Sequence, residues 1–157
     1  MITNDLSPGL ILKLTRIIFF ALIGGLSAFL LLVLYIVDSR FIFHTPVSDL
    51  LMVANFILSC IFLPGGYLFT KKVFKKIDRN ELLMNKLTRY QSGQIIRLAT
   101  CEGVGLLAIV SLLLTSNLFF LIFLLTALMI MIQYYPTPEK IGKEINLTRT
   151  EIDMFNK

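Results

Sequence analysis

One acidic residue lies inside a long apolar stretch of the chain. Glu102 is followed by no charged residue before Glu139, and it comes five positions after Arg97. In a helix with a rise of 1.5 Å per residue, five positions separate the two side chains by about 7.5 Å along the axis. At the centre of a membrane helix an ionisable side chain costs about 2.5–3.5 kcal/mol, and it normally faces the bundle interior or a water-filled cavity. Glu102 is therefore the first candidate for a functional site. The alternative is a structural role, in which its carboxylate extends to the inner interface or to a basic residue on another helix.

A second irregularity lies at nearly the same depth in another apolar stretch. Pro64 has no N–H to donate to the carbonyl of Cys60, and the two glycines after it permit local unwinding. We therefore expect the second helix to bend or unwind there. A carboxyl facing freed carbonyls is a plausible proton or cation site, made of Glu102, Cys60, Pro64 and Thr100. The same residues also fit a static link, in which a protonated Glu102 donates a hydrogen bond to the Cys60 or Ile61 carbonyl.

The other residues with chemical potential do not converge on a catalytic or metal site. His44 is the only histidine, and neither Cys60 nor Cys101 belongs to a CxxC motif. The chain has no P-loop, GxSxG, HExxH or GxGxxG motif. We therefore expect no enzyme activity, metal or cofactor. Asn55, in the second apolar stretch, is expected to hydrogen-bond to a neighbouring helix.

Long apolar helices must hold these residues. Of the 157 residues, 56% are hydrophobic and 16% are charged, whereas ordinary soluble domains have about 45–50% apolar and about 25% charged residues. Several charge-free runs have the length needed to cross about 30 Å of hydrocarbon. The pattern predicts an all-α polytopic membrane protein with four spans, at about 17–37, 50–70, 94–114 and 118–134. These spans form a transmembrane domain over 1–135, followed by a cytoplasmic tail over 136–157.

Basic residues predict the orientation of this domain. Lys and Arg gather between the second and third spans and near both ends of the chain, and the net charge is +5. Because cytoplasmic flanks retain basic residues during insertion, both termini and residues 71–92 are expected in the cytoplasm. Few aromatic residues interleave with the basic run, so we expect anionic lipid headgroups as its partner rather than nucleic acid. The residues of this cytoplasmic interface are Arg97, Lys71, Lys72, Lys75 and Lys76.

Helix-start signals place the cytoplasmic pieces. Asp78 and Glu81 have the spacing of a capping box, which predicts that the third helix begins near residue 78, well outside the membrane. In the tail, residues 137–139 and the pair Thr148 and Glu151 predict two short helices. Their few apolar residues suit a tail that packs under the bundle or on the inner leaflet. A tail that docks a partner protein is the alternative.

Small residues mark the places where helices approach each other closely. Pairs spaced four apart in the first span, and glycines beside Glu102, predict contact faces within the bundle or between copies of the chain. Gly93 is expected to weaken the third helix. The residues predicted at contact faces are Ala21, Gly24, Gly25, Ala28, Gly103 and Gly105.

Three short strings carry a resemblance. Residues 90–103 are YQSGQIIRLATCEG, residues 115–117 are TSN and residues 135–140 are YPTPEK. This set resembles an uncharacterised family of small four-helix membrane proteins from Bacteroidota and related bacteria, from which Gly93 and Ser116 depart. The resemblance implies the four-span topology and marks Arg97, Glu102 and Gly103, but it implies no activity. Residues 99–103 are also similar to the carboxylate helix of rotary-ATPase proteolipid c-subunits, which supports the ion-site hypothesis.

Together these patterns favour a small non-enzymatic, multi-pass protein of the bacterial inner (cytoplasmic) membrane. We expect it to be a subunit or accessory of a membrane complex with other membrane subunits, or a homo-oligomer. The alternative is a proton- or cation-coupled transport component that uses Glu102.

Overall fold

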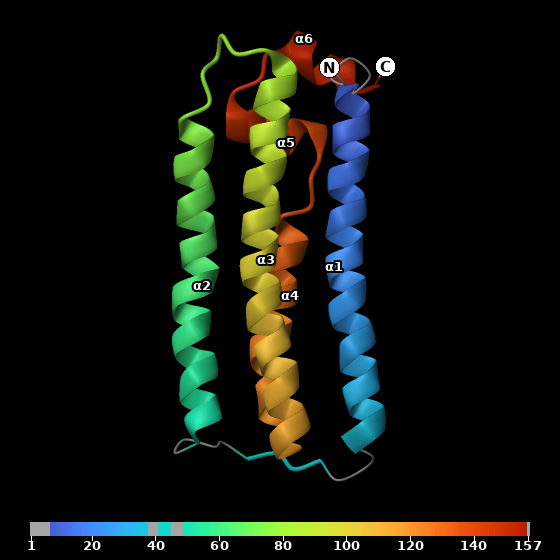
Figure 1. Cartoon of the computed structure of the whole chain (residues 1–157), viewed down its shortest axis with the longest axis vertical. Helices are drawn as coiled ribbons and strands as arrows, with labels where there is room; N and C mark the ends of the chain where they lie inside the picture. Colours follow the sequence, from blue (N-terminus) through green and yellow to red (C-terminus); the bar gives the residue numbers. More distant parts are fainter. Residues whose placement is uncertain (1–6, 38–40, 45–48, 157) are drawn as a thin grey trace, which may run out of the picture.

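The computed structural model describes residues 7–37, 41–44 and 49–156, which form a bundle of helices (Figure 1). The long helices are α1 (Pro8–Val37), α2 (Leu50–Lys75) and α3 (Leu83–Thr115). A 3-10 turn, η1 (Leu118–Phe120), leads into the shorter α4 (Leu121–Gln133). The tail contains α5 (Pro138–Ile145), α6 (Arg149–Asp153) and the 3-10 turn η2 (Met154–Asn156). The tail helices lie at the same end of the bundle as the α2–α3 connection and both chain ends (Figure 1). We call this the basic end.

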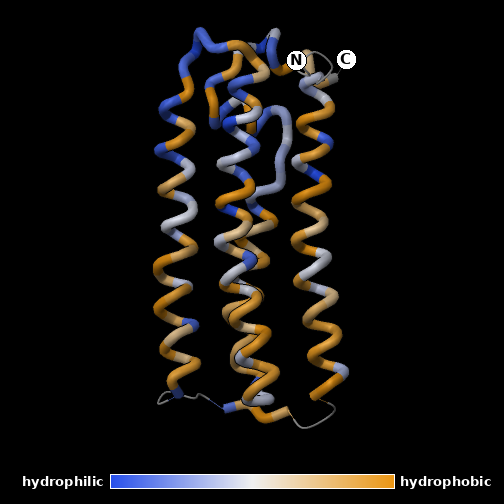
Figure 2. The backbone as a smooth tube through the Cα atoms, in the orientation of Figure 1, coloured by the Kyte–Doolittle hydropathy of each residue, from blue (hydrophilic) through white to orange (hydrophobic). Residues whose placement is uncertain are grey.

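Three helices in the described part of the chain, α1, α2 and α3, are long and apolar enough to cross a membrane. A fourth candidate is a broken one, because residues 118–133 pass the same test only together with α5, and the two pieces are bent by 86°. The described residues thus contain three candidate spans, or four if the bent pair is counted. The predicted all-helical fold is confirmed. Hydrophilic residues gather at the basic end, and apolar residues dominate the rest of the bundle (Figure 2).

Helix α3 is the centre of the bundle. It packs against α1, α2 and α4, with α1 and α2 flanking it and α4 behind it (Figure 1). Its residues Leu98, Ile109 and Leu112 are 0% exposed. They form a core with apolar residues of α1, η1 and α4, including Phe19, Leu26, Val33, Phe120, Leu124 and Met131.

Two glycines, Gly66 and Gly93, allow α2 and α3 to approach each other closely. A Cβ atom on Gly66 would overlap the side chain of Thr100, and one on Gly93 would overlap the ring of Phe74. Helix α3 runs through Gly93 without a break, so this glycine makes room for an aromatic ring of α2. Gly65, next to Gly66, faces open space.

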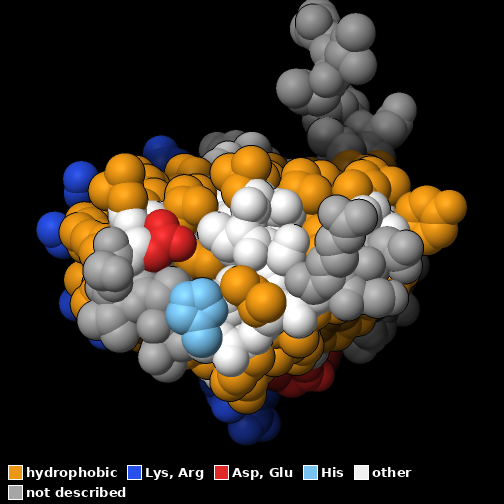
Figure 3. All heavy atoms as spheres, turned by 90° about the horizontal axis from the view of Figure 1, so that it is seen from below, with side chains coloured by type: hydrophobic (Ala, Val, Ile, Leu, Met, Phe, Trp, Pro, Cys, Tyr) orange, Lys and Arg blue, Asp and Glu red, His pale blue; other side chains and the backbone are white. Residues whose placement is uncertain are grey.

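The connections at the opposite end pair with each other. The Ile42 N–H donates to the Ser116 carbonyl and the Leu118 N–H donates to the Ile42 carbonyl, each at 3.0 Å. Asn117 donates from Nδ2 to the His44 carbonyl at 3.0 Å. Viewed along the bundle, the histidine and an acidic side chain lie on this face among mostly apolar and uncharged atoms (Figure 3). Among the described residues, this end therefore has fewer charges than the basic end.

Two predictions about the helices are wrong. Helix α3 begins at Leu83 rather than near residue 78, because Asp78 accepts a hydrogen bond from the Asn80 N–H and residues 78–81 form a turn. Glu81 pairs with Arg89 at 3.3 Å instead of completing a capping box. Helix α2 continues through Pro64, so the unwinding predicted there does not occur.

The local signals in the tail and at Asn55 are confirmed. Thr137 caps α5, and Thr148 with Glu151 forms the predicted capping box at the start of α6. Asn55 is 1% exposed and donates a hydrogen bond to Ser111 of α3 at 2.8 Å. The predicted bond between neighbouring helices is thus present.

The tail packs on the basic end of the bundle, as one of the two predictions for it required. Its residues Ile141, Ile145 and Phe155 are buried. They form a second apolar cluster with residues at the basic ends of α1, α2 and α3, namely Ile11, Leu12, Phe74, Leu87 and Tyr90. The clustering makes the tail part of the folded bundle.

We predict that Gly66→Val destabilises the protein by about 1–3 kcal/mol, because the added side chain must displace Thr100 from a packed interface. Gly65→Val is the matched control, since nothing lies within 4 Å of a Cβ placed there. Thermal unfolding of both variants in detergent measures the difference. Equal stability of the two variants would contradict the described α2–α3 contact.

Candidate functional site

The predicted link between Glu102 and the Pro64 region is not formed. Cys60 and Pro64 are exposed on α2, and the Thr100 hydroxyl donates to the Arg97 carbonyl of its own helix at 2.8 Å. Glu102 is half-buried and has no hydrogen bond or ion pair with any described residue. No bond within the described chain therefore joins these four residues.

Glu102 lies on a side of α3 that no other helix of the described chain covers. The neighbouring residues there are exposed at helical spacing, with Ile95 at 38%, Leu106 at 39% and Val110 at 37%. Ala99 and Gly103 are also exposed, and a Cβ atom on Gly103 would meet nothing within 4 Å. We call this surface the open face of α3; it consists of Ile95, Ala99, Glu102, Gly103, Leu106 and Val110.

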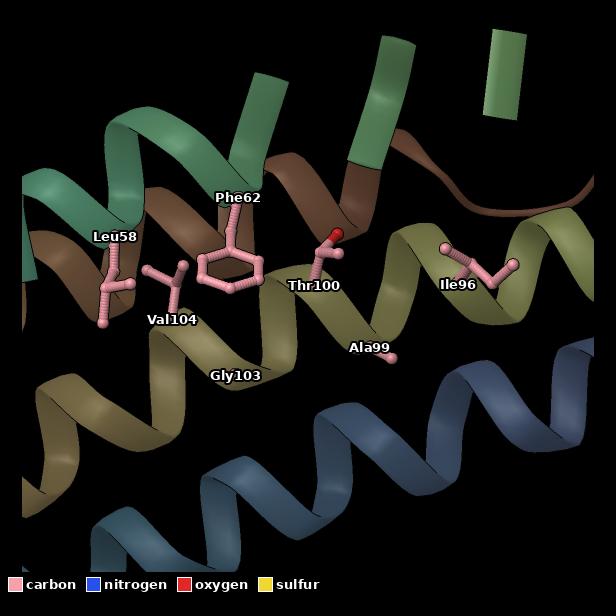
Figure 4. Close-up of a pocket in the computed structure, with 7 residues that line it drawn as sticks. All are labelled: Leu58, Phe62, Ile96, Ala99, Thr100, Gly103 and Val104. Atoms are coloured by element: carbon pink, nitrogen blue, oxygen red, sulfur yellow. The ribbon is translucent and has the colours of Figure 1, made fainter. Parts of the chain in front are cut away.

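An apolar groove runs beside the open face, between α2 and α3 (Figure 4). Its volume is about 420 Å³. Leu58 and Phe62 of α2 form one wall, and the Thr100 hydroxyl is the only polar side-chain group in the lining. The α3 wall consists of Ile96, Ala99, Thr100, Gly103 and Val104. The groove offers no carboxylate or imidazole to an ion beside Glu102.

The small residues of α1 lie on the outside of the bundle. Ala21, Gly24, Gly25 and Ala28 are all exposed, and nothing lies within 4 Å of a Cβ placed on either glycine. Neither glycine packs against another described helix, which leaves contact with another chain as the predicted packing role of this surface. Gly105 differs, because a Cβ atom there would lie 3.2 Å from side chains of α1 and α4.

Arg97 is the most extensively bonded side chain of the basic end. It is only 2% exposed, and its Nη1 and Nη2 atoms donate to the two carboxylate oxygens of Glu144 at 2.9 and 3.0 Å. Nη2 also donates to the Tyr90 hydroxyl at 3.3 Å, and Nε donates to Gln94. The guanidinium lies 4.4 Å from the centroid of the Tyr134 ring. The arginine therefore links α3 to α5 and to the segment that follows α4.

The surroundings of Arg97 extend this link to α2. Gln94, itself 0% exposed, donates to the Tyr134 carbonyl, and the Phe74 ring centroid of α2 lies 5.6 Å from the guanidinium carbon. The sequence predicts Arg97 only as an interface residue and does not single out Gln94, Tyr134 or Glu144. The signal for Glu144 is weak: it lies three residues after Ile141 and next to Ile145, on the face of α5 that becomes buried.

A second ion pair holds α6. Lys86 is 2% exposed, and its Nζ lies 2.8 Å from Glu151 Oε1. Partial burial alone would raise the pKa of Glu151, but hydrogen bonds from Lys86 and Thr148 outweigh it and hold the pKa below its usual value. Because the pKa of Glu151 is lowered in the folded chain, its contact with Lys86 stabilises the fold fully at pH values above the usual pKa of a carboxyl group. This stabilisation is lost as the pH falls through the lowered pKa.

The four lysines of the predicted cytoplasmic interface separate into two pairs. Lys71, Lys72, Lys75 and Lys76 are all exposed at the basic end of α2. Lys71 and Lys75 line a cleft together with Arg97, whereas Lys72 and Lys76 do not. The Nζ of Lys71 lies 5.7 Å from the Tyr67 ring centroid.

Comparison with family models, curated proteins and solved structures finds no match to this chain. The resemblance to a family of small four-helix membrane proteins stays a prediction. In the described part of the chain, no three His, Cys, Asp or Glu side chains gather in a group that could hold a metal ion.

Proposed function

We propose that this chain is a small non-enzymatic membrane protein that acts as a subunit of a membrane assembly. The open face of α3 is its contact surface. The observation that carries the proposal is Glu102, a half-buried carboxyl without a partner in the described chain, on a side of α3 that no helix covers. Three sides of α3 are already packed against α1, α2 and α4, so a further helix from another polypeptide would complete its surroundings.

Energetics and shape support the same surface. A carboxyl facing lipid is costly, and a hydrogen-bond donor on a partner helix offsets that cost. Ala99 lies about one helical turn before Glu102, and Gly103 directly follows it. Because both side chains are small, a second backbone can come close beside the carboxyl. The outward-facing Gly24 and Gly25 of α1 are at a similar depth, because Leu26 packs against Gly105. Copies of the chain therefore offer a second small-residue surface at the level of Glu102.

The expected placement is the inner membrane of a bacterium, with the basic end in the cytoplasm. The apolar lengths of α1, α2 and α3 support membrane insertion. The concentration of Lys and Arg at the end that also holds both chain ends supports this orientation. Anionic headgroups would then face the lysines at the end of α2.

Proton- or cation-coupled transport through Glu102 is the second candidate. The carboxyl of Glu102 has no ion-pair partner among the described residues. A group that gains and loses a proton or cation must be unpaired in part of its cycle. The groove beside it is apolar, so further ligands for an ion would come from another chain. Transport is thus a more specific form of the assembly proposal.

For the orientation, we predict that a membrane-impermeant maleimide labels His44→Cys but not Asn85→Cys in intact cells. Both residues are exposed, at opposite ends of the bundle. Cys60→Ser and Cys101→Ala remove the native thiols. Labelling of Asn85→Cys without permeabilisation would show that the basic end is outside.

For the contact surface, we predict that a photoreactive benzoylphenylalanine in place of Leu106 cross-links to a discrete protein in native membranes. The same group in place of Leu125 is the matched control, because Leu125 is an exposed leucine of α4, at 56%, outside the open face. A product at twice the chain mass indicates a homo-oligomer, and a product of another mass indicates a different subunit. Equal cross-linking from both positions, or none from Leu106, would contradict the proposal.

Variants of Glu102 distinguish a structural role of the carboxyl in the contact surface from a role in transport. Glu102→Gln keeps a hydrogen-bonding group and should preserve the cross-link, whereas Glu102→Leu should weaken it. If wild-type proteoliposomes also show a pH- or cation-dependent flux that Glu102→Gln abolishes, the assembly works in transport.

A further inference from the structure

A cleft of about 300 Å³ lies at the basic end, between α2 and the end of α5. Arg97 contributes to its lining from α3, and the Arg97 guanidinium is fixed by Glu144, Tyr90 and Gln94. The remaining charged groups of the lining are three lysines, Lys71, Lys75 and Lys143. The cleft thus combines a rigid buried cation with a rim of exposed cations.

The charge of this cleft is unbalanced within the described chain. Glu144 is its only acid, and the two carboxylate oxygens of Glu144 are already bonded to Arg97. None of the three lysines forms an ion pair with a described residue. Like charges that converge on one cleft repel each other, so an anion bound among them would be stabilised.

We propose that this cleft binds a phosphate group. A phosphate monoester carries about −1.5 to −2 charge at neutral pH and three strong acceptor oxygens, which suits several separate ammonium groups better than a single carboxylate would. Arg97 Nη1 has two N–H groups and makes one hydrogen bond within the described chain, to Glu144. Its second N–H is therefore a donor held in a fixed position by the ion pair. Asn146, at the end of α5, contributes a neutral amide to the lining.

Two sources could supply the phosphate. The cleft lies where α2 passes from apolar residues through Tyr67 to Lys71, and a tyrosine beside a lysine is typical of the boundary between a membrane and water. A lipid headgroup with a phosphate monoester would reach this level from the inner leaflet. A free phosphate would reach it from the aqueous side. Binding in the cleft does not depend on the role proposed for Glu102.

The test compares two double variants that each remove two positive charges from the same segment, residues 71–76. Lys71→Gln with Lys75→Gln removes two lysines of the cleft. Lys72→Gln with Lys76→Gln removes their exposed neighbours outside it. The detergent-purified chain is titrated with dioctanoyl phosphatidic acid, with dioctanoylglycerol as the phosphate-free control, and with inorganic phosphate. Native mass spectrometry measures bound ligand, and circular dichroism verifies the fold of each variant.

We expect the cleft variant to weaken phosphate binding by about tenfold or more, since charge-assisted hydrogen bonds are lost. The neighbouring variant should change binding by less than about threefold, because only a screened, longer-range attraction is removed. Binding of phosphatidic acid but not inorganic phosphate identifies a lipid headgroup, and similar affinity for both identifies a free phosphate. Equal weakening in the two variants, equal binding of dioctanoylglycerol, or no binding by the wild type would overturn the proposal.

Discussion

The ion pair between Arg97 and Glu144 is the interaction on which the basic end depends. A guanidinium at 2% exposure has lost its water, and only bonds to the protein can replace it. Glu144 supplies both carboxylate oxygens, and Tyr90 and Gln94 accept further hydrogen bonds. Because Glu144 belongs to α5, the pair fixes this helix against α3. Helix α5 is bent by 86° from residues 118–133, and in this position its Glu144 carboxylate reaches Arg97.

Helix α3 carries two charges five residues apart, and the structure treats them in opposite ways. Arg97 is enclosed by α2, α3, α5 and Tyr134, and its hydrogen bonds are made within the chain. Glu102 is only half-buried, on the side of α3 without a neighbouring helix. The first charge stabilises the folded chain, and the second is available to something outside it. Our proposal for the assembly surface follows from this division. The phosphate cleft instead combines the Arg97 guanidinium, held by Glu144, with three exposed lysines.

The sequence predicts those features that depend on neighbouring residues. The helix caps at Thr137 and Thr148 form as expected, because each cap involves residues within one helical turn. The signal at Asp78 is equally local, but Asp78 caps the Asn80 N–H in a turn, and α3 starts one turn later. Pro64 has no N–H to donate to the Cys60 carbonyl, but α2 continues through it from Leu50 to Lys75.

Contacts between distant residues were not predictable from one sequence. Arg97 and Glu144 are 47 positions apart, and no periodicity links an acid in the tail to an arginine in a span. Gly93 shows the same limit. Its low helix propensity predicts a weak point in α3. Its position against the Phe74 ring instead makes the missing side chain a packing requirement. The open face of α3 likewise became visible only when the other helices were placed around it.

The most direct test of the central claim is a double-mutant cycle on Arg97 and Glu144. The free energies of unfolding in detergent are measured for wild type, Arg97→Met, Glu144→Gln and the double variant. Glu139→Gln serves as a control, because Glu139 is exposed on the same helix and forms no ion pair with a described residue. If the pair fixes α5 to α3, the double variant loses less stability than the sum of the single variants, by about 1 kcal/mol or more. Single effects that add to within about 0.3–0.5 kcal/mol would contradict the account.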